Sequence, residues 1–246
     1  TLRWYQRQTM FSDKQGGYQD LEAGGGVKDY AAPVDLEKQH RIGFIRKVYG
    51  ILTFQLLVTV AMSALMMFNP AVSAFVLTHS WPYYTAMVLT FVLLIFLFCF
   101  QNVSPVNMIL LTLWTICIGY TVGLVCALYQ AVGYGDLILQ AAAITMGIFL
   151  GLTLFTLQSK IDWSFLGAGL FSALWGLIIL GFIISIFGMD GGFMGALYSW
   201  GGAVVFSLYI IFDTYLLMSK YTYDQYIPAA INLYLDIINL FLFILR

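Results

Sequence analysis

Two aspartates, Asp213 and Asp236, stand inside long apolar runs of this sequence. An acid within a membrane-spanning segment is costly to keep there, so it marks a functional site by default. Asp213 comes seven residues before Lys220, which places it roughly 10 Å below the polar end of its segment. Asp236 comes twelve residues after Asp224, roughly 18 Å along the next segment. Because a short loop joins the two segments, we expect antiparallel neighbours whose acids lie in nearby layers.

The chemistry that such a pair supports is proton sharing. Two carboxylates close together in a low dielectric cannot both ionise cheaply, so we expect them to share one proton and to titrate as a unit. The deprotonated pair would bind a cation, and the protonated pair would latch two helices together. The alternative is a structural role, in which each acid stays neutral and hydrogen-bonds to a neighbouring helix. The polar side chains that we expect to support the pair are Tyr209, Asn232, Tyr234 and Asn239.

The composition indicates that lipid surrounds these segments. Of the 246 residues, 61% are hydrophobic and 9% are charged. Between residues 48 and 159 the only acid is Asp136, the only histidine is His79, and lysine and arginine are absent. A soluble domain needs a wet surface, whereas helices in lipid satisfy their backbones internally. We therefore predict an all-α polytopic membrane protein. The lack of a basic stripe beyond the first 47 residues argues against a nucleic-acid partner.

Hydropathy divides the rest of the chain into seven segments of about 20 residues, the length that crosses a bilayer. We place the spans near 48–68, 83–101, 107–129, 137–157, 164–187, 194–218 and 226–246. The seventh is weaker because it contains polar residues, so a six-span arrangement with a re-entrant last segment stays open. Residues 1–43 are polar and contain several glycines. We expect them to form a disordered tail ahead of a membrane domain of residues 44–246.

Orientation follows from the lysines and arginines. The tail and the loops after the second, fourth and sixth spans contain ten of the eleven basic residues, and only Arg246 lies elsewhere. Positively charged segments stay on the cytosolic side of membranes. The sequence therefore predicts a cytosolic N-terminus.

No cofactor motif or catalytic nucleophile is evident. The three cysteines lack C-x-x-C spacing, and no histidines cluster near them. Residues 133–136 (GYGD) do match the G-x-G-D signature of intramembrane aspartyl proteases. Those enzymes place their first catalytic acid in an earlier span, however, and no span before Asp136 contains an acid. We expect Asp136 to lie in a turn as a helix N-cap, and a protease is only the remote alternative.

Several segments of the chain form a recognisable set of motifs. They are 44–53 (FIRKVYGILT), 55–57 (QLL), 151–156 (GLTLFT), 212–214 (FDT), 221–227 (YTYDQYI) and 233–241 (LYLDIINLF). Together they resemble the transmembrane Bax inhibitor motif family, in its lifeguard branch. The resemblance extends from about residue 41 to residue 246 and is most specific near the two acids.

The resemblance implies a seven-transmembrane-helix bundle with the last helix near the centre. It also implies a pH-sensitive calcium leak across endomembranes, in the endoplasmic reticulum or Golgi, and suppression of cell death. The paired acids of the family map onto Asp213 and Asp236, which would bind calcium transiently. Many members carry a cation at the end of the second span, thought to contact the acid of span six. Here Gln101 and Asn102 stand there, and they could donate only neutral hydrogen bonds.

These inferences lead to one working hypothesis, a calcium leak pathway gated by proton sharing between Asp213 and Asp236. Deprotonation would remove the shared hydrogen bond and separate the two helices, although the opposite pH sign stays open at this stage. The main alternative is a non-conducting membrane protein that binds apoptosis regulators or another channel. We expect the lipid bilayer and calcium ions as partners.

Overall fold

The described part of the protein is entirely helical. A computed structural model describes residues 33–189 and 191–246, with side chains from residue 37 onward. No strand occurs in these ranges. The elements are α2 (Pro33–Phe68), α3 (Pro70–Thr78), α4 (Trp81–Phe100), α5 (Val106–Ala131), α6 (Gly135–Gln158), the 3₁₀ turn η2 (Trp163–Phe165), α7 (Leu166–Phe187), α8 (Gly192–Ser219) and α9 (Tyr226–Leu245).

The prediction of a seven-span membrane bundle is confirmed. Seven of the described helices, α2 and α4–α9, are long and apolar enough to cross a membrane. The last helix, α9, is a continuous helix of 20 residues and not a re-entrant segment. The chain turns sharply between helices, as at Gly188, which ends α7 in the left-handed conformation with φ 63°. Glycine adopts this conformation without a Cβ penalty, which makes it a common helix terminator.

A further short helix, α3, lies between the first two spans and begins at Asn69 and Pro70. The Asn69 side chain accepts hydrogen bonds from the amides of Ala71 and Val72, and Pro70 occupies the first turn. The expected N-cap at Asp136 is wrong. Tyr134 is the N-cap residue of α6, and Asp136 lies exposed in the first turn. A negative charge at this end of a helix interacts favourably with the helix dipole.

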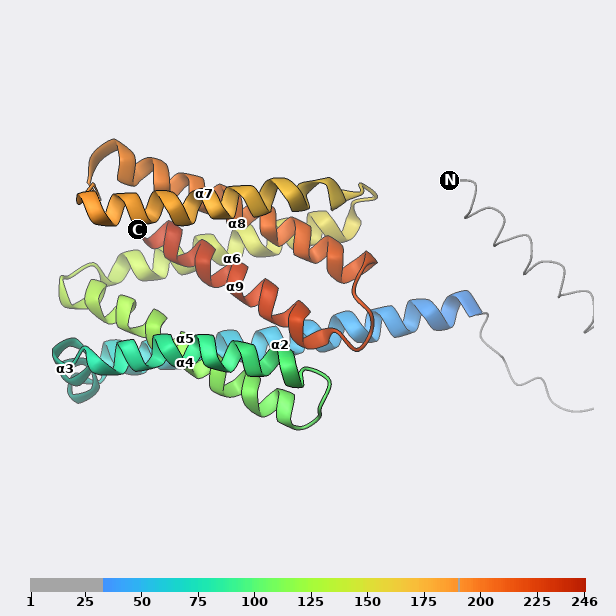
Figure 1. Cartoon of the computed structure of the whole chain (residues 1–246), viewed down its shortest axis with the longest axis horizontal. Coiled ribbons are helices and arrows are strands. Elements are labelled where there is room, and N and C mark those ends of the chain that lie inside the picture. Colours follow the sequence, from blue (N-terminus) through green and yellow to red (C-terminus); the bar gives the residue numbers. More distant parts are fainter. Residues whose placement is uncertain (1–32, 190) are drawn as a thin grey trace, which may run out of the picture. The chain divides into compact units, whose positions relative to one another are not determined.

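The last long helix fills the middle of the bundle. In Figure 1, α9 (red) runs obliquely between the other helices. It packs against α8, α6 and α5 and is the most buried of the seven long helices. Its buried side chains, including Ile227, Leu233 and Leu240, cover more than half of the helix circumference. The expected central position of the last helix is therefore confirmed.

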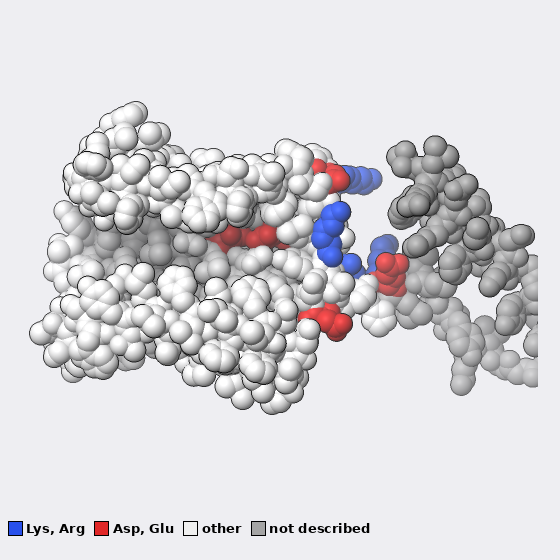
Figure 2. Space-filling view, viewed as in Figure 1, with Lys and Arg blue, Asp and Glu red and all other residues white. Residues whose placement is uncertain are grey.

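The two ends of the membrane domain differ in charge. One end holds the α4–α5, α6–α7 and α8–α9 connections together with most of the described lysines and arginines; we call it the basic end (Figure 2). The opposite end, which we call the α3 end, holds α3 and the α5–α6 and α7–α8 connections. Of the expected tail, residues 1–32 lie outside the described residues, and its part from Pro33 onward belongs to α2.

Candidate functional site

The two acids predicted from the sequence meet inside the bundle. Asp213 on α8 and Asp236 on α9 are only 6% and 5% exposed. Their carboxyl groups lie close enough to share a hydrogen bond. Figure 2 shows acidic side chains at the bottom of a hollow that is surrounded by uncharged residues. The pairing joins the two most extensively packed helices of the C-terminal half.

One carboxyl oxygen in this pair has no partner. Asp236 Oδ2 is buried and makes no hydrogen bond within the described residues. No lysine or arginine contributes to the surroundings of either carboxyl group. A buried unpaired charge is strongly unfavourable, so one proton shared between the acids, or a bound cation, best fits this geometry.

Two tyrosines stand near the pair. Tyr209, one helical turn before Asp213 on α8, lies close to both acids. Tyr221, in the α8–α9 connection, accepts a 2.9 Å hydrogen bond from the Asn232 side chain. Burial, and to a smaller extent the charge of Asp213, raises the pKa of Tyr221 to about 12. Its hydroxyl therefore stays protonated near the acids. Tyr221 was missed as a site residue, although it lies in one of the recognised family segments.

Two of the expected supporting residues point elsewhere. Tyr234 lies two residues before Asp236 and so faces the opposite side of α9. Its hydroxyl forms a 2.7 Å hydrogen bond with Thr59, and its ring meets that of Trp114 at 5.7 Å between centroids. Asn239 donates to the Leu235 carbonyl on its own helix at 2.8 Å. Neither side chain hydrogen-bonds to the acids.

Gln101 and Asn102, at the end of α4, make no hydrogen bond to either acid. Gln101 caps α4, and its carbonyl accepts a 2.9 Å hydrogen bond from the Asn107 side chain. Asn102 is exposed in the following turn. Asn107 in turn donates to the Tyr226 hydroxyl at the start of α9. The described residues thus connect α4 to α9 through Asn107, while Gln101 and Asn102 make no hydrogen bond to Asp213.

A further acid at the basic end holds α8 in place. The Tyr215 hydroxyl donates a 2.6 Å hydrogen bond to Asp162 Oδ1, which also accepts from the Ser164 amide at 2.9 Å. These hydrogen bonds, that of Tyr215 first, lower the pKa of Asp162 to about 2. Asp162 is 53 residues away from Tyr215 in the chain, so no local sequence pattern predicts this hydrogen bond.

Three hydroxyl groups gather on the other side of α8. Tyr49 on α2 lies near Thr153 on α6 and Thr214 on α8. All three oxygens are buried, and none makes a well-formed hydrogen bond. Thr214 directly follows Asp213, so this hydroxyl cluster is one residue removed from the acid pair along α8.

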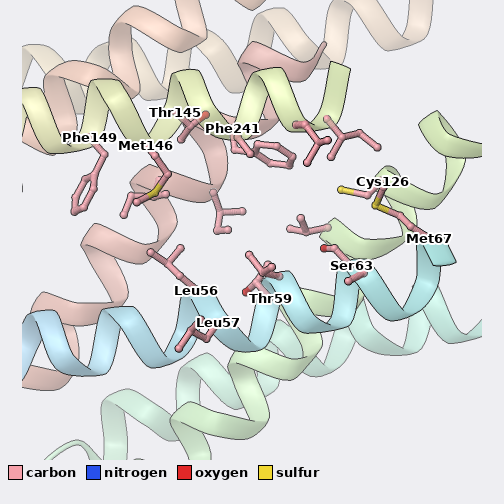
Figure 3. A pocket seen from close by; sticks show the side chains of 18 of the residues that line it. Leu56, Leu57, Thr59, Ser63, Met67, Cys126, Thr145, Met146, Phe149 and Phe241 are labelled. Atoms are coloured by element: carbon pink, nitrogen blue, oxygen red, sulfur yellow. The ribbon is translucent and has the colours of Figure 1, made fainter. Parts of the chain in front are cut away.

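The hydroxyl cluster borders a large cavity. The cavity has a volume of about 950 Å³ and lies among α2, α5, α6 and α9. Figure 3 shows Leu56 and Thr59 on α2 facing Thr145 and Phe149 on α6, with Phe241 between them. Most of the lining is apolar. Asp136 lines its mouth, but neither Asp213 nor Asp236 does. The G-x-G-D acid is therefore not part of the acid pair, which gives the protease alternative no geometric support.

Comparisons with known proteins agree with these features. The family described as "Inhibitor of apoptosis-promoting Bax1" matches residues 41–246. Protein LIFEGUARD 1 of Arabidopsis thaliana is 41% identical over 92% of this chain and 96% of its own. Protein lifeguard 4 of Mus musculus is 40% identical, over 84% of each chain. The Golgi anti-apoptotic protein of Vaccinia virus (strain Lister) is 37% identical over 92% of this chain and 94% of its own. With this coverage, the chain belongs to the transmembrane Bax inhibitor family, among its lifeguard members.

Proposed function

We propose that this protein is a calcium leak pathway whose opening is controlled by one proton shared between Asp213 and Asp236. The observation that carries the proposal is the contact between two buried carboxyl groups on neighbouring spans, with one oxygen lacking any partner. Such an arrangement is costly in a membrane protein unless it serves function.

The proton controls how α8 and α9 fit together. When the pair holds a proton, one carboxyl donates to the other and the two helices stay joined. When the proton leaves, the hydrogen bond is lost and two negative charges repel each other. The groups facing the pair are Tyr209 and Tyr221, and neither supplies a positive charge. Deprotonation therefore separates the helices, and the leak increases as the pH rises.

The open state would bind calcium transiently. Calcium prefers oxygen ligands, and it takes six to eight of them. The pair supplies two carboxylates, and no cluster of three or more His, Cys, Asp or Glu side chains occurs in the described part of the chain. Water must therefore complete the coordination shell. A site with so few protein ligands binds weakly and releases the ion quickly, as conduction requires.

The cellular role that we propose is suppression of cell death from an endomembrane. It is supported by the family description, "Inhibitor of apoptosis-promoting Bax1", and by the name of the viral relative, a Golgi anti-apoptotic protein. The basic end would face the cytosol under the positive-inside rule. The segment before α2 would then lie on that side, available to apoptosis regulators.

Calcium flux into dye-loaded proteoliposomes tests the gating proposal. We expect flux at pH 8 to exceed flux at pH 6 severalfold in the unmodified protein. Asp213→Asn and Asp236→Asn should each abolish this difference, because ionisation of the one remaining carboxyl group no longer creates repulsion between two negative charges. Asp224→Asn is the matched control, since Asp224 is exposed in the α8–α9 connection. It should leave the pH dependence intact.

The same experiment decides between the leak and its main alternative. If flux is absent, or if neither Asn substitution alters it, the leak proposal is wrong. The protein would then be a non-conducting partner of death regulators, with the two acids as structural hydrogen-bonders. A normal unfolding midpoint in both variants is needed to show that a lost pH response does not reflect misfolding.

A further inference from the structure

The cavity beside the hydroxyl cluster has the dimensions of a ligand site. Its volume of about 950 Å³ falls at the upper end of the range of about 300–1,000 Å³ for small-molecule pockets. On α2 its wall extends from Tyr49 to Phe68, roughly 28 Å at 1.5 Å per residue. The cavity is therefore long and follows the helix axis within the membrane-spanning region.

The cavity opens sideways, toward the bilayer. Leu57 and Val60 on α2 line it and are 63% and 64% exposed, while Leu139 on α6 lines it and is 71% exposed. Figure 3 shows that the side chains of α2 and α6 face each other across the opening without interdigitating. At this depth the surrounding medium is lipid hydrocarbon. A lipid chain can thus enter between α2 and α6 without leaving the apolar phase.

Polar groups lie at both ends of the cavity. At the α3 end the mouth is lined by Gln130 and Asp136. The Gln130 side chain rests against the backbone of Gly135, where a Cβ would collide with it. At the deep end are the hydroxyls of Tyr49 and Thr153. The intervening walls are mainly apolar, including Met146 and Phe149 (Figure 3), and the hydroxyls of Thr53, Thr59 and Thr145 among them donate to carbonyls of their own helices.

We propose that this cavity binds one hydrocarbon chain of a zwitterionic membrane lipid, whose headgroup lies at Gln130 and Asp136. Apolar cavities exclude water and accept apolar guests, and the lining here matches a methylene chain. The headgroup choice follows from charge. Among the described residues that line the cavity, Asp136 is the only carboxylic acid and none is a lysine or arginine, so a choline or ethanolamine group fits the mouth better than an anionic headgroup.

This site has a consequence for the acid pair. A chain that fills the cavity down to Tyr49 and Thr153 keeps water away from the hydroxyl cluster, and hence from Thr214 beside Asp213. The binding itself does not depend on the proposed leak. It can therefore be tested in a protein that conducts no ions at all.

Photolabelling tests the proposal directly. The full chain is reconstituted with phosphatidylcholine that carries a diazirine at the middle of one acyl chain, and the labelled residues are mapped by mass spectrometry. We expect the label to concentrate on cavity-lining residues of α2 and α6. Ala142→Trp fills the cavity from α6 and should remove most of that label. Ala143→Trp, one residue further on an exposed face outside the cavity, should not.

A second pair of variants, on α2, keeps the test valid if Ala142→Trp fails to fold. Ala64→Trp fills the cavity from α2 and should act like Ala142→Trp, while Ala61→Trp projects outside it and is the matched control. Label spread evenly over all lipid-facing helices, or label that persists in both filled variants, would overturn the proposal. So would rapid reaction of Cys126, which lines the cavity, with a charged methanethiosulfonate, because that result means a water-filled space.

A separate experiment tests which headgroup binds at Asp136. Phosphatidylglycerol with the same diazirine chain should label the cavity less than phosphatidylcholine does. Asp136→Asn should remove this difference while leaving chain labelling in place. Equal labelling by both lipids in the unmodified protein would overturn the assignment of the headgroup to Asp136.

Discussion

The Tyr215 hydroxyl donates a 2.6 Å hydrogen bond to Asp162, and this contact joins the α6–α7 connection to α8 two residues after Asp213. It fixes the rotation of α8 at the basic end. The direction in which Asp213 points therefore depends on a contact that lies outside the acid pair. We expect loss of the Tyr215–Asp162 hydrogen bond to lower the stability of the bundle and also to weaken the contact between Asp213 and Asp236.

Removing this hydrogen bond should lower thermal stability in a pH-dependent way. Tyr215→Phe should lower the unfolding midpoint at pH 7 by about 2–4 °C, the shift typical of one lost interaction in a domain of this size. The pKa of Asp162 is lowered to about 2, below the usual value of about 4. Its stabilising effect is therefore complete above about pH 4 and is lost as the pH falls toward 2.

Thermal unfolding in detergent at pH 7, 5 and 3 measures this effect. The difference between the unmodified protein and Tyr215→Phe should be equal at pH 7 and 5 and smaller at pH 3. Tyr84→Phe is the control, since Tyr84 is exposed and its hydroxyl makes no described hydrogen bond. A Tyr215→Phe protein that unfolds like the unmodified one at pH 7 would contradict the prediction.

A second prediction concerns the close approach of α8 to α9 at Gly202. A Cβ at this position would collide with the ring of Phe243, including its Cγ atom, which cannot swing away freely. Gly202→Ala should therefore destabilise the protein by about 1–3 kcal/mol, the usual range for overpacking. Reversible unfolding in mixed detergent measures the free energy.

The neighbouring glycine provides the control. A Cβ at Gly201 meets nothing within 4 Å. Gly201→Ala should be neutral, or more stable by up to about 1 kcal/mol, because alanine favours the helix. If the two variants behaved alike, the close packing of α8 on α9 at this level would be wrong.

Arg41 should hold the α8–α9 connection closed. Its guanidinium donates to the Tyr221 carbonyl at 2.7 Å and lies 5.0 Å from the centre of the Tyr223 ring. Arg41→Ala removes both contacts, so amide hydrogens in residues 220–226 should exchange severalfold faster. Hydrogen–deuterium exchange with mass spectrometry reports this segment directly. Arg46→Ala, at an exposed position without a described contact, should leave the exchange unchanged.

The centre of the bundle should depend more on the ring of Tyr234 than on its hydroxyl. Thr59 already donates its proton to the Gln55 carbonyl, so Tyr234 is the donor in the Thr59–Tyr234 hydrogen bond. Tyr234→Phe should cost about 1 kcal/mol, the net value of one such bond. Tyr234→Ala should cost about 3–5 kcal/mol, because it leaves a cavity against Trp114. Equal costs for the two changes would contradict this account.

The sequence was sufficient to predict the spans and to place the two acids near each other. Apolar length determines where a helix can cross a bilayer, and the distance of Asp213 and Asp236 from loop residues determines their level. The helix at Pro70 was missed because Asn followed by Pro is both a turn signal and a helix start. Only the hydrogen bonds of Asn69 to following amides distinguish the two.

The rotation of each helix was harder to predict. Tyr234 could have been excluded from the site, since two residues correspond to about 200° of rotation away from Asp236. Asn239, by contrast, lies on the same side as Asp236, and its local hydrogen bond to Leu235 became visible only in the structure. The contact of Asp162 with Tyr215 joins distant segments and depends on the packing of the whole bundle.

The central position of α9 also constrains the order of biosynthesis. The six spans that surround it are made first and enter the membrane before the helix that fills their middle exists. During that interval Asp213 has no carboxyl partner, and the apolar faces that later meet Leu233 and Leu240 are uncovered. Until the seventh helix inserts, the bundle therefore exposes an acid and apolar packing faces that the finished protein buries.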